Sequence, residues 1–460
     1  MSLSAVLHAK TEEMNSNEKR AMYTVCVVGC KPIGITHAYL FAAAGFKVIC
    51  ADPDQNATSL LARGKAPGCE HGTETKLRAY LKTGQLVATS DVKTAVSQSD
   101  VVAVTTPVEI DKKRKIDRSD LEKTCKLVGS QLRKGALVII VSTVGLGIIE
   151  NVLKEILENA SGLKVGTDFG LAYSPDQAPQ EKASHVIKDN DRVVAASDVR
   201  SLNVASTILE ITLGKNVKRT DTVKVAEAAA LFKKAQKDTS VALANELAHF
   251  CEKASIDYLE VQRLANTDSF CELSTPTLSG GSMREEPYLL LEDAENLNVK
   301  LRMVQTAKET NALTIKQTAN LVADALKSCG KPLRRARVSI LGVSQTQNTR
   351  SVKREALKDL VSTLESRGAR ISLYDPYFSD LENTETEHQY KKSLTEAIEG
   401  ADCLLIVTGH DQFKRLNLKK TRAMLKTSAA IIDLEGVFDP GKVEKEGLVY
   451  RGLGRGVWTR

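Results

Sequence analysis

The segment Tyr23–Asp52, YTVCVVGCKPIGITHAYLFAAAGFKVICAD, decides the fold of the first part of the chain. An apolar run ends at Gly29, a turn with glycine and proline follows, a helical segment ends at Gly45, and a second β-branched run ends at Asp52. A strand, a tight glycine turn, a helix and a strand form one βαβ unit, whose strands lie parallel under covering helices. The segment therefore predicts the beginning of a doubly wound α/β domain.

The same pattern continues on both sides of a helical middle region. Further apolar runs that we interpret as strands are DVVAVTTP, ALVIIVST and FGLAYSP before that region, and RVSILG, ARISLYDP, DCLLIVTGH and AAIIDLEG after it. The middle, from about Thr220 to Gly330, is rich in Ala, Leu, Glu and Lys with a period near 3.6 and includes a helix of roughly 30 residues. We therefore predict an α/β fold with two doubly wound Rossmann-like domains joined by a central helical dimerisation region.

Composition indicates a folded cytoplasmic protein and excludes several classes. The 460 residues include 64 Lys and Arg against 57 Asp and Glu, so the net charge of +7 is too dilute to predict nucleic-acid binding. The nine cysteines contain no CxxC pair, which argues against a metal site or a disulfide framework. No apolar stretch is long enough for a membrane helix, and the N-terminus lacks the apolar core of a signal peptide.

The first glycine turn is a candidate dinucleotide site. Gly29-Cys-Lys-Pro-Ile-Gly34 follows a strand and opens a helix, whose N-terminus suits a pyrophosphate, and Asp52 at the end of the next strand suits the ribose hydroxyls. An acid at this place disfavours a 2′-phosphate, so NAD is predicted rather than NADP. The middle glycine of G-x-G-x-x-G is replaced by Lys31, which either contributes charge or obstructs the cofactor. The alternative is a structural turn that binds nothing.

Several longer segments resemble one enzyme family in a single order along the chain. They are ARGKAPGCEHG (62–72), TTPVEID (105–111), STVGLG (142–147), SGLKVGTDFGLAYSPDQ (161–177), ALANELAHFCEKASIDYLEV (242–261), VTGHDQFKRL and YRGLGRG. On these segments the chain resembles the UDP-glucose/GDP-mannose dehydrogenase family, in particular its UDP-N-acetylmannosamine and UDP-N-acetylglucosamine 6-dehydrogenases.

The resemblance implies a domain plan. An N-terminal extension (1–20) precedes an NAD-binding Rossmann-like domain (21–215), a central helical dimerisation domain (216–330) and a C-terminal nucleotide-sugar (UDP) binding domain (331–460). The implied partners are a nucleotide sugar and a second copy of the chain, bound through the central helix. In this family the C6 hydroxyl of the sugar is oxidised to a carboxylate in two NAD-dependent steps, through a thioester on a cysteine.

The resemblance also implies site residues. Those that match the cofactor and active-site loops are Gly29, Gly34, Asp52, Thr106, Pro107 and Thr143. Those that match substrate loops are Gly280 and Gly281 beside the sugar, and a basic residue of the C-terminal domain, which is Lys353 or Arg354 depending on register.

The chain departs from the family pattern where the chemistry takes place. The cysteine of G-G-x-C is replaced by Met283, and a thioether forms no thiohemiacetal. In the helix motif A-E-x-x-K-x-x-x-N the oxyanion lysine is Ala230 and the asparagine is Lys234. The glutamate of S-P-E-R is Asp176, and the later aspartate matches Glu286 only with a gap of one residue. Asp176 and Lys234 therefore remain as the candidate catalytic residues.

Other side chains offer alternatives to the missing groups. Lys234 lies one helical turn from position 230 and can replace the lost charge. Cys271 can act as a nucleophile only by moving toward position 283, and buried packing is the usual role of a free cysteine. His185 is either a surface or structural histidine or a base beside the Asp176 loop. For His410, which matches a family position, packing is favoured over chemistry.

These features lead to one prediction and two alternatives. The prediction is an NAD-dependent oxidoreductase-family protein that acts on, or binds, a nucleotide sugar such as UDP-N-acetylhexosamine or UDP-glucose at a CH–OH group. It stops after one hydride, because hydride transfer needs positioning and a base but no covalent intermediate. The alternatives are a non-catalytic nucleotide-sugar-binding or partner protein, and an ordinary four-electron dehydrogenase.

Overall fold

The computed structural model divides the chain into two compact units, each with its own parallel sheet. Unit 1 consists of Met1–Lys234 and Glu285–Lys300, and unit 2 of Ala235–Arg284 and Leu301–Arg460. The residues that the structure describes are 6–8, 14, 16–69, 72–111, 114–175, 191–214, 217–267, 271–278, 286–349, 355–378 and 390–458.

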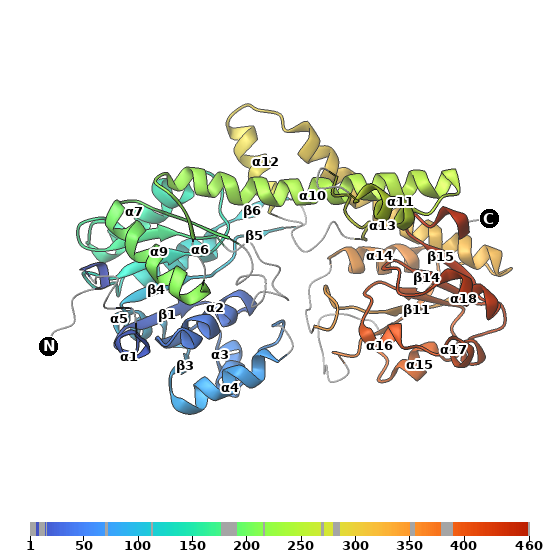
Figure 1. The fold of residues 1–460 in the computed structure, drawn as a ribbon, viewed down its shortest axis with the longest axis horizontal. Coiled ribbons are helices and arrows are strands. Elements are labelled where there is room, and N and C mark those ends of the chain that lie inside the picture. Colours follow the sequence, from blue (N-terminus) through green and yellow to red (C-terminus); the bar gives the residue numbers. More distant parts are fainter. Residues whose placement is uncertain are drawn as a thin grey trace. The chain divides into compact units, whose positions relative to one another are not determined.

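Unit 1 is built on an eight-stranded sheet in the order β10-β9-β8-β7-β4-β1-β2-β3 (Figure 1). Its strands are β1 (Thr24–Val28), β2 (Lys47–Ala51), β3 (Leu86–Thr89), β4 (Val101–Val104), β7 (Leu137–Ile140), β8 (Gly170–Tyr173), β9 (Arg192–Ala196) and β10 (Val217–Thr220). All neighbours pair parallel except β8 and β9. The strand order reverses between β4 and β1, which is where open α/β sheets bind their ligands.

Helices pack on this sheet because its strands are apolar on both faces. The helices of unit 1 are α1 (Asn17–Arg20), α2 (Pro32–Ala43), α3 (Gln55–Ala62), α4 (Thr73–Thr83), α5 (Val92–Ser97), α6 (Ser119–Gly129), α7 (Lys154–Ser161), α9 (Val199–Leu213) and α12 (Pro287–Asn296). In β1, Val25 and Val27 belong to the core shared with α2 and α9, whereas Cys26 and Val28 belong to the core shared with α5 and α6. This alternation is the double winding that the sequence predicted.

Two features of unit 1 do not follow from the strand pattern. A short hairpin of β5 (Glu109–Ile110) and β6 (Ile116–Asp117) leaves the sheet after β4. In addition, the described part of the N-terminal extension is packed into the core: Val6, Leu7 and Met14 are each at most 5% exposed.

Unit 2 contains a five-stranded parallel sheet in the order β12-β11-β13-β14-β15. Its strands are β11 (Arg337–Leu341), β12 (Arg370–Tyr374), β13 (Cys403–Ile406), β14 (Ala430–Asp433) and β15 (Val449–Gly452). Its helices are α11 (Tyr258–Ala265), α13 (Arg302–Ser328), α14 (Glu355–Ser366), α15 (Leu394–Ile398), α16 (Asp411–Lys414), α17 (Leu418–Met424) and α18 (Pro440–Lys445). The order reverses between β11 and β13, so this unit has a ligand crevice of its own by the same rule.

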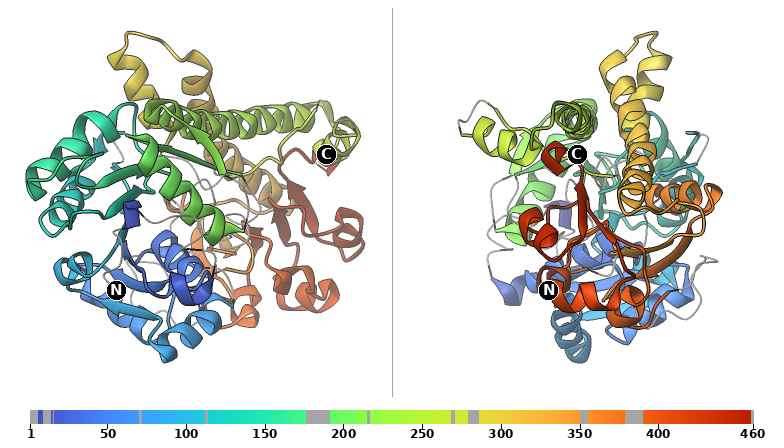
Figure 2. Two further views of the ribbon diagram at one scale, coloured as in Figure 1. Left: turned by 60° about the vertical axis from the view of Figure 1, so that its left-hand side comes forward. Right: turned by 90° about the vertical axis from the view of Figure 1, so that its right-hand side faces the viewer.

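The predicted long central helix is α10 (Val223–Ala254), which is unbroken in both views of Figure 2. Its residues belong to unit 1 up to Lys234 and to unit 2 from Ala235. Within unit 2 it is joined to α13 by a buried amide contact, in which Asn245 Nδ2 donates to Asn311 Oδ1 (3.0 Å). The predicted fold class, with two doubly wound Rossmann-like sheets and a helical region between them in sequence, is confirmed.

Candidate functional site

The turn between β1 and α2 has the geometry that its two glycines predict. Gly29 has a φ of +116°, and a Cβ there would lie 2.6 Å from Thr105 Oγ1. A Cβ on Gly34 would lie 1.8 Å from the carbonyl oxygen of Gly29. Neither position accepts a larger side chain without rebuilding the turn, so the close approach of α2 to β1 depends on both glycines.

Asp52 fastens this turn to the end of β2. Its Oδ2 accepts a hydrogen bond from the Cys30 amide (2.7 Å) and its Oδ1 one from the Asp54 amide (2.9 Å). A carboxylate has about four acceptor positions. Asp52 therefore retains acceptor capacity for the ribose hydroxyls of a dinucleotide.

The other predicted cofactor residues lie at the same edge of the sheet, after β4 and β7. Thr105 Oγ1 donates to the Val28 carbonyl (2.9 Å), and Ser142 Oγ donates to the Thr106 carbonyl (2.6 Å). These contacts join the loops after β1, β4 and β7, which carry Gly29, Thr106 and Thr143. Pro107 continues the loop after β4 toward the hairpin. Thr105 and Ser142 are the fastening residues that the sequence analysis did not single out.

Lys31 lies at the N-cap of α2 but makes no capping hydrogen bond with its side chain. The first-turn N–H groups of a helix have no partner inside the helix, and they favour an anion. The Lys31 ammonium lies 3.4 Å from Glu109 Oε1, and the two side chains are 62% and 46% exposed. The residues of the turn therefore fit a dinucleotide, with a cation beside its diphosphate position that is weakly held by one carboxylate.

Removing the Lys31 charge is expected to weaken NAD binding. An exposed ion pair contributes at most about 1 kcal/mol, so Lys31→Gln should raise the Kd about fivefold, and Glu109→Gln should lower it by a smaller factor. Titration calorimetry with NAD at low salt measures both. Lys123→Gln, at an exposed lysine of α6, is the charge-matched control. Tighter binding by Lys31→Gln would mean that the lysine obstructs the cofactor.

Two buried carboxylates hold the turn after β7. Glu227 of α10 is fully buried and accepts hydrogen bonds from the amides of Gly147 (2.5 Å) and Ile149 (3.0 Å). Asp293 of α12 accepts one from the Leu146 amide (2.8 Å). Burial raises the pKa of both carboxyl groups above the ordinary values. Both act on the backbone of the STVGLG turn, and the sequence analysis assigned neither of them a role.

Lys234, a predicted catalytic residue, is buried and paired. Its ammonium contacts Glu286 Oε1, and the two side chains are 7% and 32% exposed. One helical turn earlier Ala230 is fully buried, so the position of the family's oxyanion lysine is apolar here. The charge that replaces it belongs to an ion pair.

The remaining predicted catalytic and substrate residues, together with two of the alternatives, lie outside the described part of the chain. They are Asp176, His185, Gly280, Gly281, Met283, Lys353 and Arg354.

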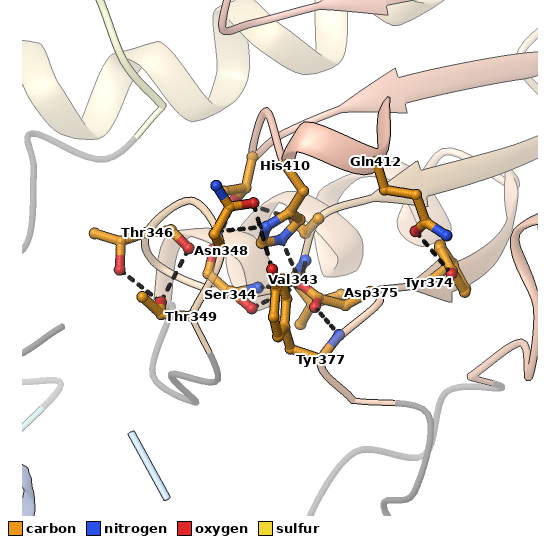
Figure 3. A network of polar contacts seen from close by, with 12 residues as sticks. Val343, Ser344, Thr346, Asn348, Thr349, Tyr374, Asp375, Tyr377, His410 and Gln412 are labelled. Carbon is orange, nitrogen blue, oxygen red and sulfur yellow. Dashed lines mark hydrogen bonds and ion pairs between the residues drawn. The ribbon is translucent and has the colours of Figure 1, made fainter. Parts of the chain in front are cut away.

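In unit 2, a polar network lies after the central strands β11, β12 and β13 (Figure 3). Asp375 follows β12, and its Oδ2 accepts hydrogen bonds from the amides of Val343 and Ser344 (2.8 Å each), from Ser344 Oγ (2.8 Å) and from His410 Nε2 (3.0 Å). The Tyr377 amide donates to Oδ1 (2.9 Å). Burial acts to raise the pKa of Asp375, but these donors outweigh it and hold the pKa below the ordinary value.

His410 follows β13 and contacts the loop after β11 with its other ring nitrogen. The Asn348 amide donates to Nδ1 (2.8 Å). The sequence analysis placed this histidine in packing, and it does stack near Tyr377 and Phe413, with ring centroids 5.2 and 5.4 Å apart. The hydrogen bonds at both ring nitrogens are the part that sequence pattern did not reveal.

Among the helices of the described residues, none combines the length and the apolar character needed to cross a bilayer. In the same residues no cluster of three or more His, Cys, Asp and Glu side chains suits a metal ion.

Three family models match successive parts of the chain. Residues 23–212 match the NAD binding domain of the UDP-glucose/GDP-mannose dehydrogenase family, residues 224–313 its central domain, and residues 339–440 its UDP binding domain.

Individual relatives match over almost the whole length. The UDP-N-acetyl-D-mannosamine dehydrogenase of Pyrococcus horikoshii is 26% identical over 435 residues, which are 94% of this chain and 99% of that protein. UDP-glucose 6-dehydrogenase TuaD of Bacillus subtilis is 25% identical over 94% of each chain. A solved structure of the Pyrococcus horikoshii UDP-D-ManNAc dehydrogenase has a TM-score of 0.84 and covers 94% of this chain and 100% of that one.

Proposed function

The chain belongs to the UDP-glucose/GDP-mannose dehydrogenase family, and we propose that it oxidises a CH–OH group of a UDP-sugar with NAD in a single hydride transfer. The family membership that the sequence predicted is confirmed, and so is NAD as the cofactor. The stop after one hydride, the identity of the sugar and the roles of individual residues are the content of the proposal.

The choice of substrate class rests on the C-terminal part of the chain and on the relatives. Residues 339–440 match a UDP binding domain, and both relatives named above are dehydrogenases of UDP-sugars. Lys353, Gly280 and Gly281 are proposed to contact the nucleotide sugar, as the family motifs imply.

The cofactor is proposed to lie at the carboxyl edge of the unit 1 sheet. Gly29 and Gly34 leave room for the diphosphate at the α2 N-terminus, Asp52 accepts hydrogen bonds from ribose hydroxyls, and Thr106, Pro107 and Thr143 line the same edge. When bound, NAD supplies a carbon that accepts a hydride. The protein supplies position and exclusion of water.

The proposed reaction balances without a covalent intermediate. The hydride of the CH–OH carbon goes to NAD, the hydroxyl proton goes to a base, and the products are a carbonyl group and NADH. Glu286 is proposed as that base, with Lys234 holding its carboxylate; their ion pair is the single observation that carries the assignment. Asp176 takes the place of the family's glutamate in the neighbouring loop.

A second oxidation is not expected, because the groups that support it are replaced. The thioether of Met283 cannot add to an aldehyde, and the side chain of Ala230 can donate no hydrogen bond to an oxyanion. The buried Ala230 also gives a second candidate function its support: if Lys234 is held only as a structural partner of Glu286, the protein binds the nucleotide sugar without oxidising it.

Absorbance of NADH tests the proposal. The purified protein, with NAD and a panel of UDP-sugars, is expected to produce one NADH per sugar consumed, with the carbonyl product trapped by hydroxylamine. Two NADH per sugar would contradict the single-hydride proposal. Binding of a UDP-sugar in calorimetry with no NADH would favour the non-catalytic function, and absence of binding to both NAD and UDP-sugars would overturn both functions.

Two further properties are proposed for the intact protein. We expect a homodimer formed through α10, because this helix carries a stripe of exposed apolar side chains. We also expect the protein in the reducing cytoplasm: all nine cysteines lie in described residues, and all of them are free thiols.

A further inference from the structure

The contacts of His410 determine which of its ring nitrogens carries the proton. The Asn348 amide can only donate, so Nδ1 accepts and carries no proton. The Asp375 carboxylate, in turn, accepts from Nε2. The ring is therefore neutral, with its proton on Nε2, because each nitrogen has a partner that fixes its role. Both side chains of the His410–Asp375 pair are fully buried, so neither can touch a ligand directly.

This pair holds the loop Gly342–Thr349, which follows β11. Gly342 begins the loop at a φ of +87°, and a Cβ there would lie 2.5 Å from the Thr408 carbonyl oxygen. Asp375 takes the next two amides, and His410 takes that of Asn348, which has a φ of +60°. Side-chain contacts of Asn348 with Asp411 complete the attachment (2.9 and 3.1 Å).

The loop lies where a ligand is expected in this unit. Strand order reverses between β11 and β13, and open α/β sheets bind ligands at the carboxyl ends of the strands at such a point. The loop also lies inside the stretch that matches a UDP binding domain and leads directly to the segment of Lys353. The backbone conformation of this loop therefore sets the shape of the proposed nucleotide site.

We propose that His410 is a positioning residue for the nucleotide sugar: in its neutral form it holds the Gly342–Thr349 loop ready to bind, and its protonation releases the loop. The inference rests on the proposed UDP-sugar binding. A doubly protonated ring has two donors. Nδ1–H would then face the Asn348 N–H, and a hydrogen bond would be replaced by contact between two donors.

The surroundings of the ring contain groups of both effects. Titratable and charged groups of the described residues around it are Tyr374, Asp375 and Tyr377 at the end of β12, Asp411 and Lys414 in α16, and Glu435 after β14. Asp375 and Asp411 favour a proton on the ring, whereas Lys414 and the Asn348 N–H oppose it. Loss of the Asn348 bond as the pH falls is the expected result of this competition.

The test is the pH dependence of UDP-sugar binding in wild type, His410→Gln and His410→Ala. A glutamine can accept from the Asn348 amide and donate to Asp375, but it takes up no proton. The probes are UDP-glucose and UDP-N-acetylmannosamine, whose phosphates are both diesters and stay ionised from pH 5.5 to 7.5. Calorimetry should give a wild-type Kd about tenfold weaker at pH 5.5 than at pH 7.5, as expected for the loss of one buried hydrogen bond.

The variants separate positioning from packing. We expect His410→Gln to bind like the wild type at pH 7.5 and to keep that Kd within twofold at pH 5.5, and His410→Ala to bind weakly at both values. Exchange of the loop amides, corrected for intrinsic rates, should accelerate at pH 5.5 in wild type but not in His410→Gln. His249→Gln, at a half-exposed histidine of α10, is the matched control, and thermal unfolding verifies that each variant is folded.

The two proposals fail in different ways. If the wild type binds UDP-sugars and its Kd and loop exchange have the same pH dependence in His410→Gln, the positioning role is wrong and the proposed function stands. If the wild type binds no UDP-sugar at either pH, the proposed function is wrong, and with it the role of His410 in nucleotide binding.

Discussion

The double substitution Met283→Cys and Ala230→Lys is expected to yield a protein that releases a UDP-sugar carboxylate, with two NADH formed per sugar. The wild type should release none above background. We expect the rate of carboxylate formation to rise at least on the order of 10³-fold, because an oxyanion donor alone contributes about 10²–10³ and a nucleophile adds to it.

The physical reason is the fate of the aldehyde after the first hydride transfer. A thiolate adds to it, the resulting thiohemiacetal gives its hydride to a second NAD, and water cleaves the thioester to the carboxylate and the free thiol. Two NAD and one water are consumed, and both electron pairs leave as NADH. Ala230 is fully buried and lies one helical turn from the Lys234–Glu286 pair, so a lysine there would bring a cation into an apolar place beside it.

Chromatographic separation of the UDP-sugar products, together with NADH absorbance, measures this result. The control is Met283→Ala with Ala230→Lys, which has the cation without the thiol and should form no carboxylate. Thermal unfolding and NAD titration establish that both variants fold and bind the cofactor. A folded double variant that binds NAD and UDP-sugar yet forms no carboxylate would show that the loss extends beyond these two positions.

The double substitution Phe232→Glu and Phe250→Glu is expected to convert a dimer into monomers. Along α10 the strongly exposed apolar side chains are Val225, Phe232, Leu243 and Phe250, which are 54%, 59%, 50% and 63% exposed. Their intervals of 7, 11 and 7 residues correspond to whole turns of a helix, so they lie on one face. A second copy of the chain can bury the same stripe on both partners, as a two-fold interface requires.

Burial of a phenylalanine contributes about 1.5–3 kcal/mol, and two per protomer become four in a symmetric dimer. Their loss corresponds to about 6 kcal/mol or more, a change of about 10⁴-fold in the dimer Kd, and the introduced charges also repel each other. Light scattering after gel filtration should give twice 50.0 kDa for the wild type and 50.0 kDa for the variant. Val199→Glu, at a 72% exposed valine of α9, is the control that should stay dimeric. A wild type of 50.0 kDa at micromolar concentration would contradict the dimer.

The parts that sequence predicted are those that depend on near neighbours in the chain. The turn Gly29–Gly34 is an example, because a positive φ, the close approach of a helix and an acid at the end of the next strand all leave local signals. The family motifs extended this to the NAD and UDP domains. The single 32-residue helix of the middle region likewise follows from a 3.6-residue period.

The parts that it missed connect residues that are distant in the chain. Lys234 and Glu286 are 52 positions apart, Leu146 and Asp293 are 147 apart, and Asp375 and His410 are 35 apart. Each of these acids also has an ordinary surface or capping role in many sequences. Periodicity and motif spacing carry no information about which of them meet, because that depends on how strands order within the sheet and how helices cross it.

The sequence by itself determined the double winding, the glycine turn that fits NAD and the absence of cysteine at position 283, because each is a property of local chain geometry or of one side chain. Only the tertiary structure decided that the charge of Lys234 is matched by Glu286 and that His410 is neutral with its proton on Nε2. Protonation and pairing depend on the groups that folding brings within hydrogen-bond distance, so they arise only when the sheets and helices have closed around them.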